Sequence, residues 1–275
     1  KPFYQKLGLL RDRQLKLNSD IAEQIKIIQQ VKPDVIRGYG SAFQLLVAHG
    51  QEENIKLHSP RTIFTDSELL SEDLRNRIEQ AFDTEVIDVY GSFETENVAY
   101  ECSQHQGYHM AIDCAVIEFI KDGEHVKPGE VGELVFTVLD NYTFPFIRYN
   151  IGDLASYTDQ PCSCGRTLPL MDVSAGRMAD YAVTRDGKKV SSTVFLGRLQ
   201  QLGEYIREFQ VIQEDLNLFT ALIVPPSRYH ENVGAQIIDD LLGNLPGADI
   251  NIRLVQKIDR GNSGKLKVFK SLMKT

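Results

Sequence analysis

Short apolar runs alternate with amphipathic segments along residues 19–90, and this alternation restricts the possible fold more than any other feature. Three runs have the length and apolar content of strands: residues 35–38, 62–64 and 86–90. The segments between them have apolar residues at helical spacing, and we expect their helices to open at Ser19-Asp20, Ser41 and Ser71. Strands that alternate with helices form a parallel sheet covered by helices. The sequence therefore predicts an α/β fold here.

The pattern changes between residues 108 and 160, where residues 116–120 and 132–138 read as short antiparallel strands. Beyond Gly176 a strand pair, a helix, two strands, a helix and a last strand follow one another. Their predicted positions are around Asp186-Gly187, then 193–203, 207–213, 217–224, 229–243 and 251–255. We predict two domains: residues 1–176, a helix-covered sheet with a small β region, and residues 177–275, a small α+β domain.

The bulk properties exclude several classes of protein. The chain has 275 residues and a net charge of −8, with acidic and basic residues interleaved, which disfavours a nucleic-acid partner. We expect no membrane span, because no apolar run reaches the roughly 18 residues that one needs. The first residues do not form a signal peptide, so we expect a cytoplasmic protein. The chain begins with Lys1, so we also expect part of a longer protein.

Two polar stretches lie in the first predicted domain. The strand 86–90 ends in Tyr90-Gly91-Ser92-Phe93-Glu94, and open α/β sheets bind ligands at the carboxyl ends of such strands. Asp153 follows a glycine and can accept hydrogen bonds from two hydroxyls, as a ribose offers. Alone, each stretch is explained more simply as an ordinary turn.

Two further stretches lie at and beyond the domain boundary. Arg177 follows Gly176, where an arginine could clamp a phosphate beside a hinge, although a plain surface arginine fits equally well. Lys265 follows Gly264 on a loop that could present a mobile positive charge, or could be a flexible basic tail. The Gly-Lys pair is not a Walker loop, because the earlier glycine and the following Ser or Thr are absent.

In this order, the stretches resemble the nucleotide-binding motifs of the adenylate-forming superfamily. The chain is most similar to the phenylacetate–CoA ligase and capsule-biosynthesis group. The segments that carry the resemblance are residues 90–94, 101–102, 107–109, 129–134, 145–149, 153, 162–166, 176–177 and 263–265. The resemblance implies that residues 1–176 are the C-terminal part of the large AMP-binding domain and that residues 177–275 are the lid domain.

The resemblance implies ATP and AMP as ligands, with Mg²⁺ on the phosphates. Tyr90 would lie against the adenine, with Gly91 and Ser92 in the same nucleotide-binding motif. Glu94 would hold Mg²⁺, and Asp153 would bind the ribose hydroxyls.

Two residues near and within the predicted lid complete the implied site. Arg177 would steady the nucleotide, and Lys265 would stabilise the substrate carboxylate and the α-phosphate. The implied reaction converts a small carboxylic acid and ATP into acyl-AMP, and coenzyme A would then take the acyl group. Positioned cations supply most of the catalysis in such phosphoryl chemistry.

Departures from the family pattern leave alternatives open. Phe93 replaces the usual hydroxyl residue, Ala179 stands where an acidic residue is common, and residues 184–189 are altered. The Ser/Thr/Gly-rich phosphate loop is absent from residues 1–90, so we expect a missing N-terminal segment and no acyl-adenylate formation by this chain alone. The alternatives are a zinc-stabilised binding module without catalysis and an adenylyltransferase with another acceptor. A homodimer is a further open alternative.

Four soft side chains have the number and type that tetrahedral zinc prefers: Cys102, His109, Cys162 and Cys164. A closed set of four ligands implies a structural role, because no coordination position is left for a substrate. His105 is the competing ligand, and we expect Cys114 to be a core thiol in an apolar strand. The alternative is a group of free cysteines without a metal, since Cys-x-Cys is less diagnostic than Cys-x-x-Cys.

Overall fold

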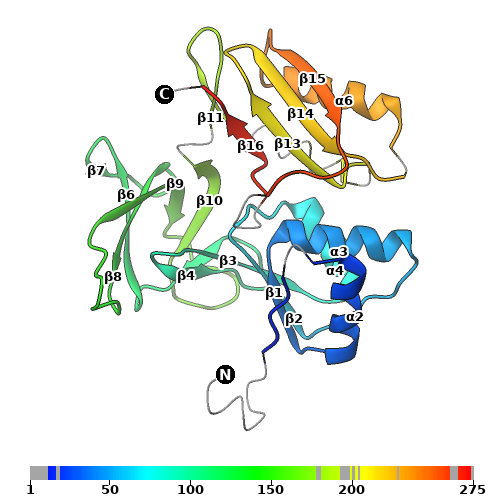
Figure 1. The fold of residues 1–275 in the computed structure, drawn as a ribbon. Helices are drawn as coiled ribbons and strands as arrows, with labels where there is room; N and C mark the ends of the chain where they lie inside the picture. Colours follow the sequence, from blue (N-terminus) through cyan, green and yellow to red (C-terminus); the bar gives the residue numbers. More distant parts are fainter. Residues whose placement is uncertain are drawn as a thin grey trace.

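The computed structural model describes residues 12–16, 19–177, 181–192, 199, 202–203, 205–227, 229–260 and 266–273 (Figure 1). The helices within these residues are α2 (Ile21–Val31), α3 (Gly40–Glu52), α4 (Glu72–Phe82) and α6 (Glu231–Leu242). The strands of the first part are β1 (Val35–Gly38), β2 (Thr62–Asp66), β3 (Val86–Ser92), β4 (Glu96–Tyr100), β5 (Tyr108–Met110), β6 (Ala115–Lys121), β7 (Glu124–His125), β8 (Gly132–Val138), β9 (Tyr149–Thr158) and β10 (Leu170–Arg177). Those of the last part are β11 (Tyr181–Val183), β12 (Lys189–Ser191), β13 (Glu208–Gln213), β14 (Leu218–Val224), β15 (Asp249–Leu254) and β16 (Phe269–Ser271).

Helix starts follow from local capping where the sequence offers a cap. The Asp20 side chain accepts a 3.0 Å hydrogen bond from the amide of Glu23, and Ser71 caps α4 as predicted. The prediction that Ser41 opens α3 is wrong, because the helix begins one residue earlier and its N-cap is Tyr39. Glu68, from the loop after β2, accepts hydrogen bonds from both the amide and the hydroxyl of Ser41. A tertiary carboxylate thus replaces the local cap at this helix start.

One sheet of mixed direction organises residues 35–177. Its strand order is β1-β2-β3-β4-β5-β10-β9-β8-β6-β7, with β1, β2 and β3 parallel and the following pairs antiparallel. The parallel strands confirm the α/β prediction for the first 90 residues. The small β region, which we expected to follow as a separate feature, is continuous with them through β4, β5 and β10.

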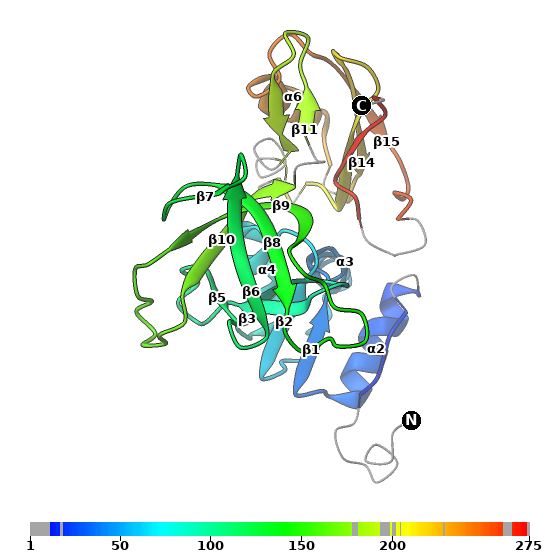
Figure 2. The ribbon, with the colours of Figure 1, turned by 90° about the vertical axis from the view of Figure 1, so that its left-hand side faces the viewer.

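Separate apolar cores support the two halves of this sheet. Helices α2, α3 and α4 pack on the parallel half, where Phe43, Ile63 and Phe82 are almost fully buried (Figure 1). The antiparallel half has its own core around Leu134 and Phe136. Figure 2 shows strands β6 to β10 curving away from the helix-covered strands. The carboxyl end of β3 lies where the parallel half gives way to the antiparallel half.

The last part of the chain has a core of its own, drawn from residues 182–269. Strands β15, β14, β13 and β16 form its sheet in that order, and β11 pairs with β12 around Gly187 as predicted. The predicted strands 207–213 and 217–224 and the helix 229–243 are confirmed within two residues at each end. The predicted helix 193–203 falls largely outside the described residues. The domain boundary at Gly176 stays a prediction, and β10 runs through it.

Polar contacts join this last part to α3. The side-chain amide of Gln44 donates a 2.8 Å hydrogen bond to the carbonyl of Arg207, whose guanidinium pairs with Glu52. Arg260 donates a 3.1 Å hydrogen bond from Nη1 to the hydroxyl of Ser41. Within the described part of the chain, no helix is long and apolar enough to span a membrane.

Candidate functional site

Tyr90 and Asp153 meet at the carboxyl end of β3. The Tyr90 hydroxyl donates a 2.7 Å hydrogen bond to Oδ2 of Asp153, which is 8% exposed. Gly91 follows Tyr90, and a Cβ on it would lie 1.9 Å from the carbonyl oxygen of Glu96. Only glycine therefore lets β3 and β4 approach closely beside this pair. The structure thus brings two of the predicted nucleotide-binding side chains into contact.

Glu94 lies in the turn that follows β3 and contacts β9, the strand that carries Asp153. Tyr149, at the start of β9, donates a 3.4 Å hydrogen bond to Oε1 of Glu94. The hydroxyl of Ser92 accepts hydrogen bonds from the amides of Glu94 and Thr95, which shapes the turn. Phe93 is fully exposed and takes no part in this packing. As a residue, Glu94 is partly exposed.

The backbone of Arg177 lies beside Asp153. The two residues are partners in the antiparallel pairing of β10 with β9, next to an irregularity in the register. Gly152 precedes Asp153 with a φ of +81°, a conformation that favours glycine. The structure therefore places the backbones of two distant motifs together, whereas Lys265 and Ala179 lie outside the described residues.

The four predicted metal ligands converge. One ligand atom from each of them lies within 4.8 Å of all the others. The sulfurs of Cys102 and Cys162 lie 3.7 Å apart, and Cys164 Sγ lies 3.4 Å from His109 Nε2. Zinc–sulfur bonds of about 2.3 Å and zinc–nitrogen bonds of about 2.0 Å in a tetrahedron require separations of about 3.8 Å and 3.5 Å. The donor set therefore fits a zinc ion.

Hydrogen bonds around the cluster favour the metal-binding forms of two donor groups, the Cys164 thiol and the His109 ring. The amide of Arg166 donates a 3.4 Å hydrogen bond to Cys164 Sγ, and such hydrogen bonding lowers the pKa of this thiol to about 6. The Nδ1–H of His109 donates to the carbonyl of Leu168 at 3.4 Å, since a carbonyl can only accept. That tautomer directs the Nε2 lone pair toward Cys164, as metal-bound histidines require.

Two further predictions concern His105, the competing ligand, and Cys114, the expected core thiol. His105 lies outside the cluster, and its Nδ1 is 3.3 Å from Oε2 of Glu101. The prediction that Cys114 is a core thiol in a strand is wrong. This residue lies in the turn before β6 and is partly exposed, because the strand begins only at Ala115.

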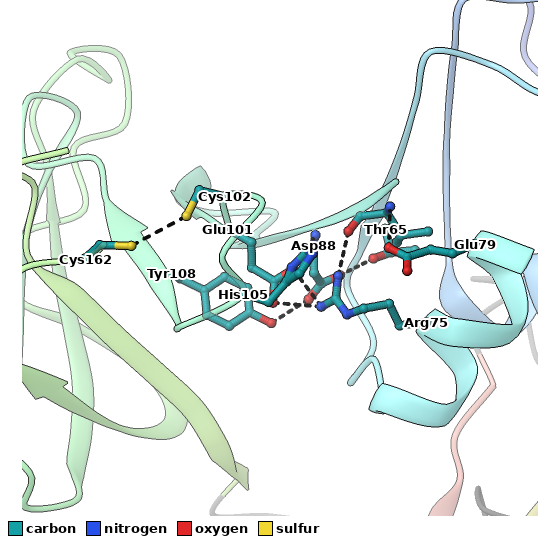
Figure 3. A network of polar contacts seen from close by, with 10 residues as sticks. Thr65, Arg75, Glu79, Asp88, Glu101, Cys102, His105, Tyr108 and Cys162 are labelled. Atoms are coloured by element: carbon teal, nitrogen blue, oxygen red, sulfur yellow. Dashed lines mark hydrogen bonds and ion pairs between the residues drawn. The ribbon is translucent and has the colours of Figure 1, made fainter. Parts of the chain in front are cut away.

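Sequence reasoning missed a buried polar network between β3 and the metal-ligand loop, residues 101–109 (Figure 3). The Asp88 carboxylate is 4% exposed and accepts hydrogen bonds from the hydroxyls of Thr65 and Tyr108. Glu101 forms a two-point ion pair with Arg75, at 2.7 and 2.8 Å, and accepts a hydrogen bond from the amide of Asp88. Burial raises the pKa of Asp88 to about 7, against the lowering effect of the two hydroxyls. The available signal was a carboxylate in the middle of an apolar strand.

Comparisons with known proteins agree on one class. The family model described as AMP-binding enzyme matches residues 7–138, and the one described as CapK C-terminal domain matches residues 182–271. A phenylacetate-coenzyme A ligase of Thermus thermophilus is 29% identical over 69% of this chain and 44% of its own length. Protein CapK of Staphylococcus aureus is 24% identical over 88% of this chain and 53% of its own.

One solved enzyme shares the fold in two states. The 2-hydroxyisobutyryl-CoA ligase in its postadenylation state, with 2-HIB-AMP, superposes with a TM-score of 0.77 at 21% identity, covering 90% of this chain and 56% of that one. The same ligase with 2-HIB-AMP and CoA in its thioesterification state gives 0.54 at 19% identity, covering 94% and 59%.

The sheet with its nucleotide-type motifs, followed by a small α+β unit, defines an adenylate-forming type of protein. The chain is a partial member of the adenylate-forming family, with residues 7–138 matching the AMP-binding model and residues 182–271 the CapK C-terminal model. It spans about half the length of the curated relatives that it matches.

Proposed function

We propose that this chain supplies the nucleotide-binding edge and the lid of an enzyme that activates a small carboxylic acid with ATP. The products of the first step are acyl-AMP and pyrophosphate. In the second step, the thiol of coenzyme A attacks the acyl carbon and releases AMP. The relatives named as coenzyme A ligases support this reaction class.

The hydrogen bond between Tyr90 and Asp153 is the observation that carries the proposal. It unites two motifs that are 63 residues apart at the carboxyl end of a parallel strand, where open α/β sheets bind ligands. In this proposal Tyr90 positions the adenine and Asp153 accepts the ribose hydroxyls. Gly91 and Ser92 belong to the same proposed nucleotide-binding turn. A side chain at Gly91 would collide with β4, and the Ser92 hydroxyl accepts a hydrogen bond from the amide of Glu94.

In this proposal, three further residues act at the phosphates and the nucleotide. Glu94 is a hard oxygen donor and would hold Mg²⁺ on the phosphates. Arg177 would steady the nucleotide beside the ribose, since its backbone pairs with Asp153. Lys265 would stabilise the charge that builds up on the carboxylate and α-phosphate during adenylyl transfer.

Nucleotide binding tests the proposal directly. We expect AMP to bind the chain in calorimetric titrations, and we expect Asp153→Ala to weaken that binding at least about tenfold, because a bound hydroxyl pair loses its acceptor. Asp159→Ala is the matched control, since Asp159 is an exposed residue just beyond the same strand. Equal AMP affinity in both variants, or no binding by the unmodified chain, would contradict the proposal.

The complete gene product tests the chemistry. A pyrophosphate-release screen over aryl and alkyl acids is expected to find a substrate, and thioester formation then identifies coenzyme A as the acceptor. An acyl-adenylate that forms without thioester would indicate the adenylyltransferase with another acceptor. Nucleotide binding without any pyrophosphate release would instead indicate a module without catalysis, which the exposed Phe93 in place of a hydroxyl residue favours.

The second part of the proposal is a structural zinc ion held by the Cys102, His109, Cys162 and Cys164 cluster. The ion would join the loop after β4 to the loop after β9, which are also linked by hydrogen bonds that Ser163 donates to the side chains of Gln104 and Gln106. Metal analysis of protein purified without chelator is expected to find one zinc per chain. Cys164→Ser should lower that content strongly, and Cys114→Ser should leave it unchanged, because Cys114 lies outside the cluster. Unmodified protein that is purified without chelator and contains no zinc would contradict this site.

A further inference from the structure

Asp88 lies at the junction of three strands and is the central residue of the buried network in Figure 3. Its Oδ2 accepts a 2.6 Å hydrogen bond from the hydroxyl of Tyr108 on β5, and its Oδ1 accepts one from Thr65 on β2. Tyr108 is therefore its link toward the metal-ligand loop, and Thr65 is its link toward the helix-covered strands. Removal of one hydroxyl or the other therefore gives two comparable variants.

Both ends of the metal-ligand loop, residues 101–109, are attached to this one residue. Glu101 accepts a 2.9 Å hydrogen bond from the Asp88 amide and donates its own amide to the Asp88 carbonyl at 3.0 Å. Glu101 immediately precedes the proposed ligand Cys102, and Tyr108 immediately precedes His109. A movement of either ligand therefore acts on a direct hydrogen-bond partner of Asp88.

Asp88 is in turn close to the nucleotide edge. Side chains two residues apart on a strand lie on the same face, so Asp88 and Tyr90 share a face of β3. The ring of Tyr90 packs edge-on against the ring of Tyr108, with centroids 6.4 Å apart. The Tyr90 hydroxyl is the group that binds Asp153. A displacement of Tyr108 thus reaches Tyr90 through the strand and through the ring.

The buried surroundings of Asp88 favour the passing on of such a displacement to neighbouring residues. Asp88 and Glu101 lie in a region from which water is largely excluded, where hydrogen bonds are strong and packed atoms cannot be compressed. The Arg75 guanidinium anchors Glu101 to α4, so that end of the loop has a fixed support. The Tyr108 end has the Asp88 carboxylate as its side-chain partner.

We infer that the Tyr108–Asp88 hydrogen bond couples metal binding to the nucleotide edge, so that metal occupancy of the cluster sets the position of Tyr90. Tyr108 and Asp88 are positioning residues in this inference, since they contact neither the metal nor the nucleotide. The inference rests on the metal site of the proposed function. It goes beyond that function by giving the zinc an influence on nucleotide binding.

Hydrogen exchange measured by mass spectrometry tests the coupling without a nucleotide. The metal-free and zinc-loaded forms are compared for the full chain, for Tyr108→Phe and for Thr65→Val. Each variant removes one hydroxyl from Asp88 and keeps nearly the same shape. In the unmodified chain and in Thr65→Val, zinc is expected to slow exchange in residues 86–92 at least about fivefold. In Tyr108→Phe the slowing there is expected to fall below about twofold, while residues 101–109 remain protected.

Equal zinc-induced protection of residues 86–92 in the two variants would overturn the coupling, including the case in which the whole chain becomes ordered on zinc binding. Protection confined to residues 101–109 in the unmodified chain would also overturn it and would leave the metal site standing. If no zinc binds, the metal site fails and the coupling falls with it.

AMP titrations provide the second measurement. Zinc is expected to raise the AMP affinity of the unmodified chain and of Thr65→Val at least about fivefold, and that of Tyr108→Phe less than about twofold. An equal rise in both variants would overturn the coupling. If the exchange pattern is as expected and AMP does not bind, the nucleotide part of the proposed function fails and the coupling stands.

Discussion

The Tyr90 hydroxyl and the Asp153 carboxylate, 63 residues apart in the chain, form a 2.7 Å hydrogen bond at the carboxyl end of β3. Asp153 is buried, and Tyr90 is half-buried between Phe136 and Tyr108. The pair therefore links β3 to β9 beside the proposed nucleotide site. Its loss should affect ligand binding more than folding.

Tyr90→Phe is expected to weaken AMP binding roughly tenfold, or about 1.4 kcal/mol, because Asp153 loses the donor that orients it. The free energy of unfolding should fall by only about 1–2 kcal/mol. Calorimetry and urea unfolding measure the two effects. Tyr100→Phe is the control, since its hydroxyl donates to the Asn97 carbonyl on an exposed surface. Unchanged AMP affinity in Tyr90→Phe would remove the pair from the site.

The Arg75–Glu101 ion pair is expected to support the metal-ligand loop, because both side chains are shielded from water, at 11% and 7% exposure. Arg75→Met leaves the buried Glu101 carboxylate without its arginine partner and should lower the free energy of unfolding by about 3–5 kcal/mol. In the control Arg37→Met, Asp66 loses an arginine partner that is 51% exposed, and the loss of unfolding free energy should stay below about 1 kcal/mol. Similar losses for both variants in urea unfolding would contradict the assignment.

The raised pKa of Asp88 predicts that the stability of the fold depends on pH. Burial raises its pKa from 3.8 to about 7 in the folded protein, so the folded state binds this proton more tightly than the unfolded state does. Its contribution to stability is therefore unfavourable above both pKa values and disappears as the pH falls from about 7 to about 4. Relative to Asp88→Asn, the unmodified protein should lose on the order of 4 kcal/mol of unfolding free energy between pH 4 and pH 8.

The measurement is the difference in unfolding free energy between the two proteins at each pH, which cancels the titration of groups common to both. A difference that stays constant over this range, or that changes in the opposite direction, would show that the raised pKa of Asp88 does not govern stability.

Metal removal is expected to destabilise the loops that the cluster joins. A structural zinc site can contribute on the order of 10 kcal/mol to folding, and part of that is lost when a chelator removes the ion. The melting temperature of zinc-loaded protein should therefore fall on chelation, and added zinc should restore it. Cys164→Ser should melt low without responding to chelator, whereas Cys114→Ser should behave like the unmodified chain. A melting temperature that is insensitive to chelator would contradict a structural metal.

The polar contacts between α3 and the last part of the chain predict a sensitivity to charge. Glu52→Lys reverses one member of the Glu52–Arg207 ion pair, which should loosen this placement and increase the radius of gyration in solution scattering. Glu53→Lys makes the same charge change at an exposed neighbouring residue and is the control. Equal scattering from the two variants would show that this ion pair does not hold the arrangement.

Elements with short-range causes were predictable. The helix from Ile21 to Val31 follows its apolar spacing and its Asp20 cap, and Ser71 caps the next predicted start in the same way. The start at Ser41 was misjudged, because Glu68 approaches it from another element. The order of the family motifs likewise identified Tyr90 and Asp153 as candidates, and the number and type of soft donors identified the four metal ligands. Their roles remain proposals, although the structure brings the two nucleotide candidates into contact and gathers the four ligands.

The sequence by itself determined the periodicities, the helix caps, the family motifs and the set of soft metal donors, because each depends on residue type at short spacing. Only the tertiary structure decided that the antiparallel strands continue the parallel sheet, and that Thr65, Asp88, Glu101 and Tyr108 form one buried network. The reason is that strand pairing and burial depend on which distant segments meet. A buried carboxylate such as Asp88 acquires its raised pKa and its partners only when water has been excluded around it.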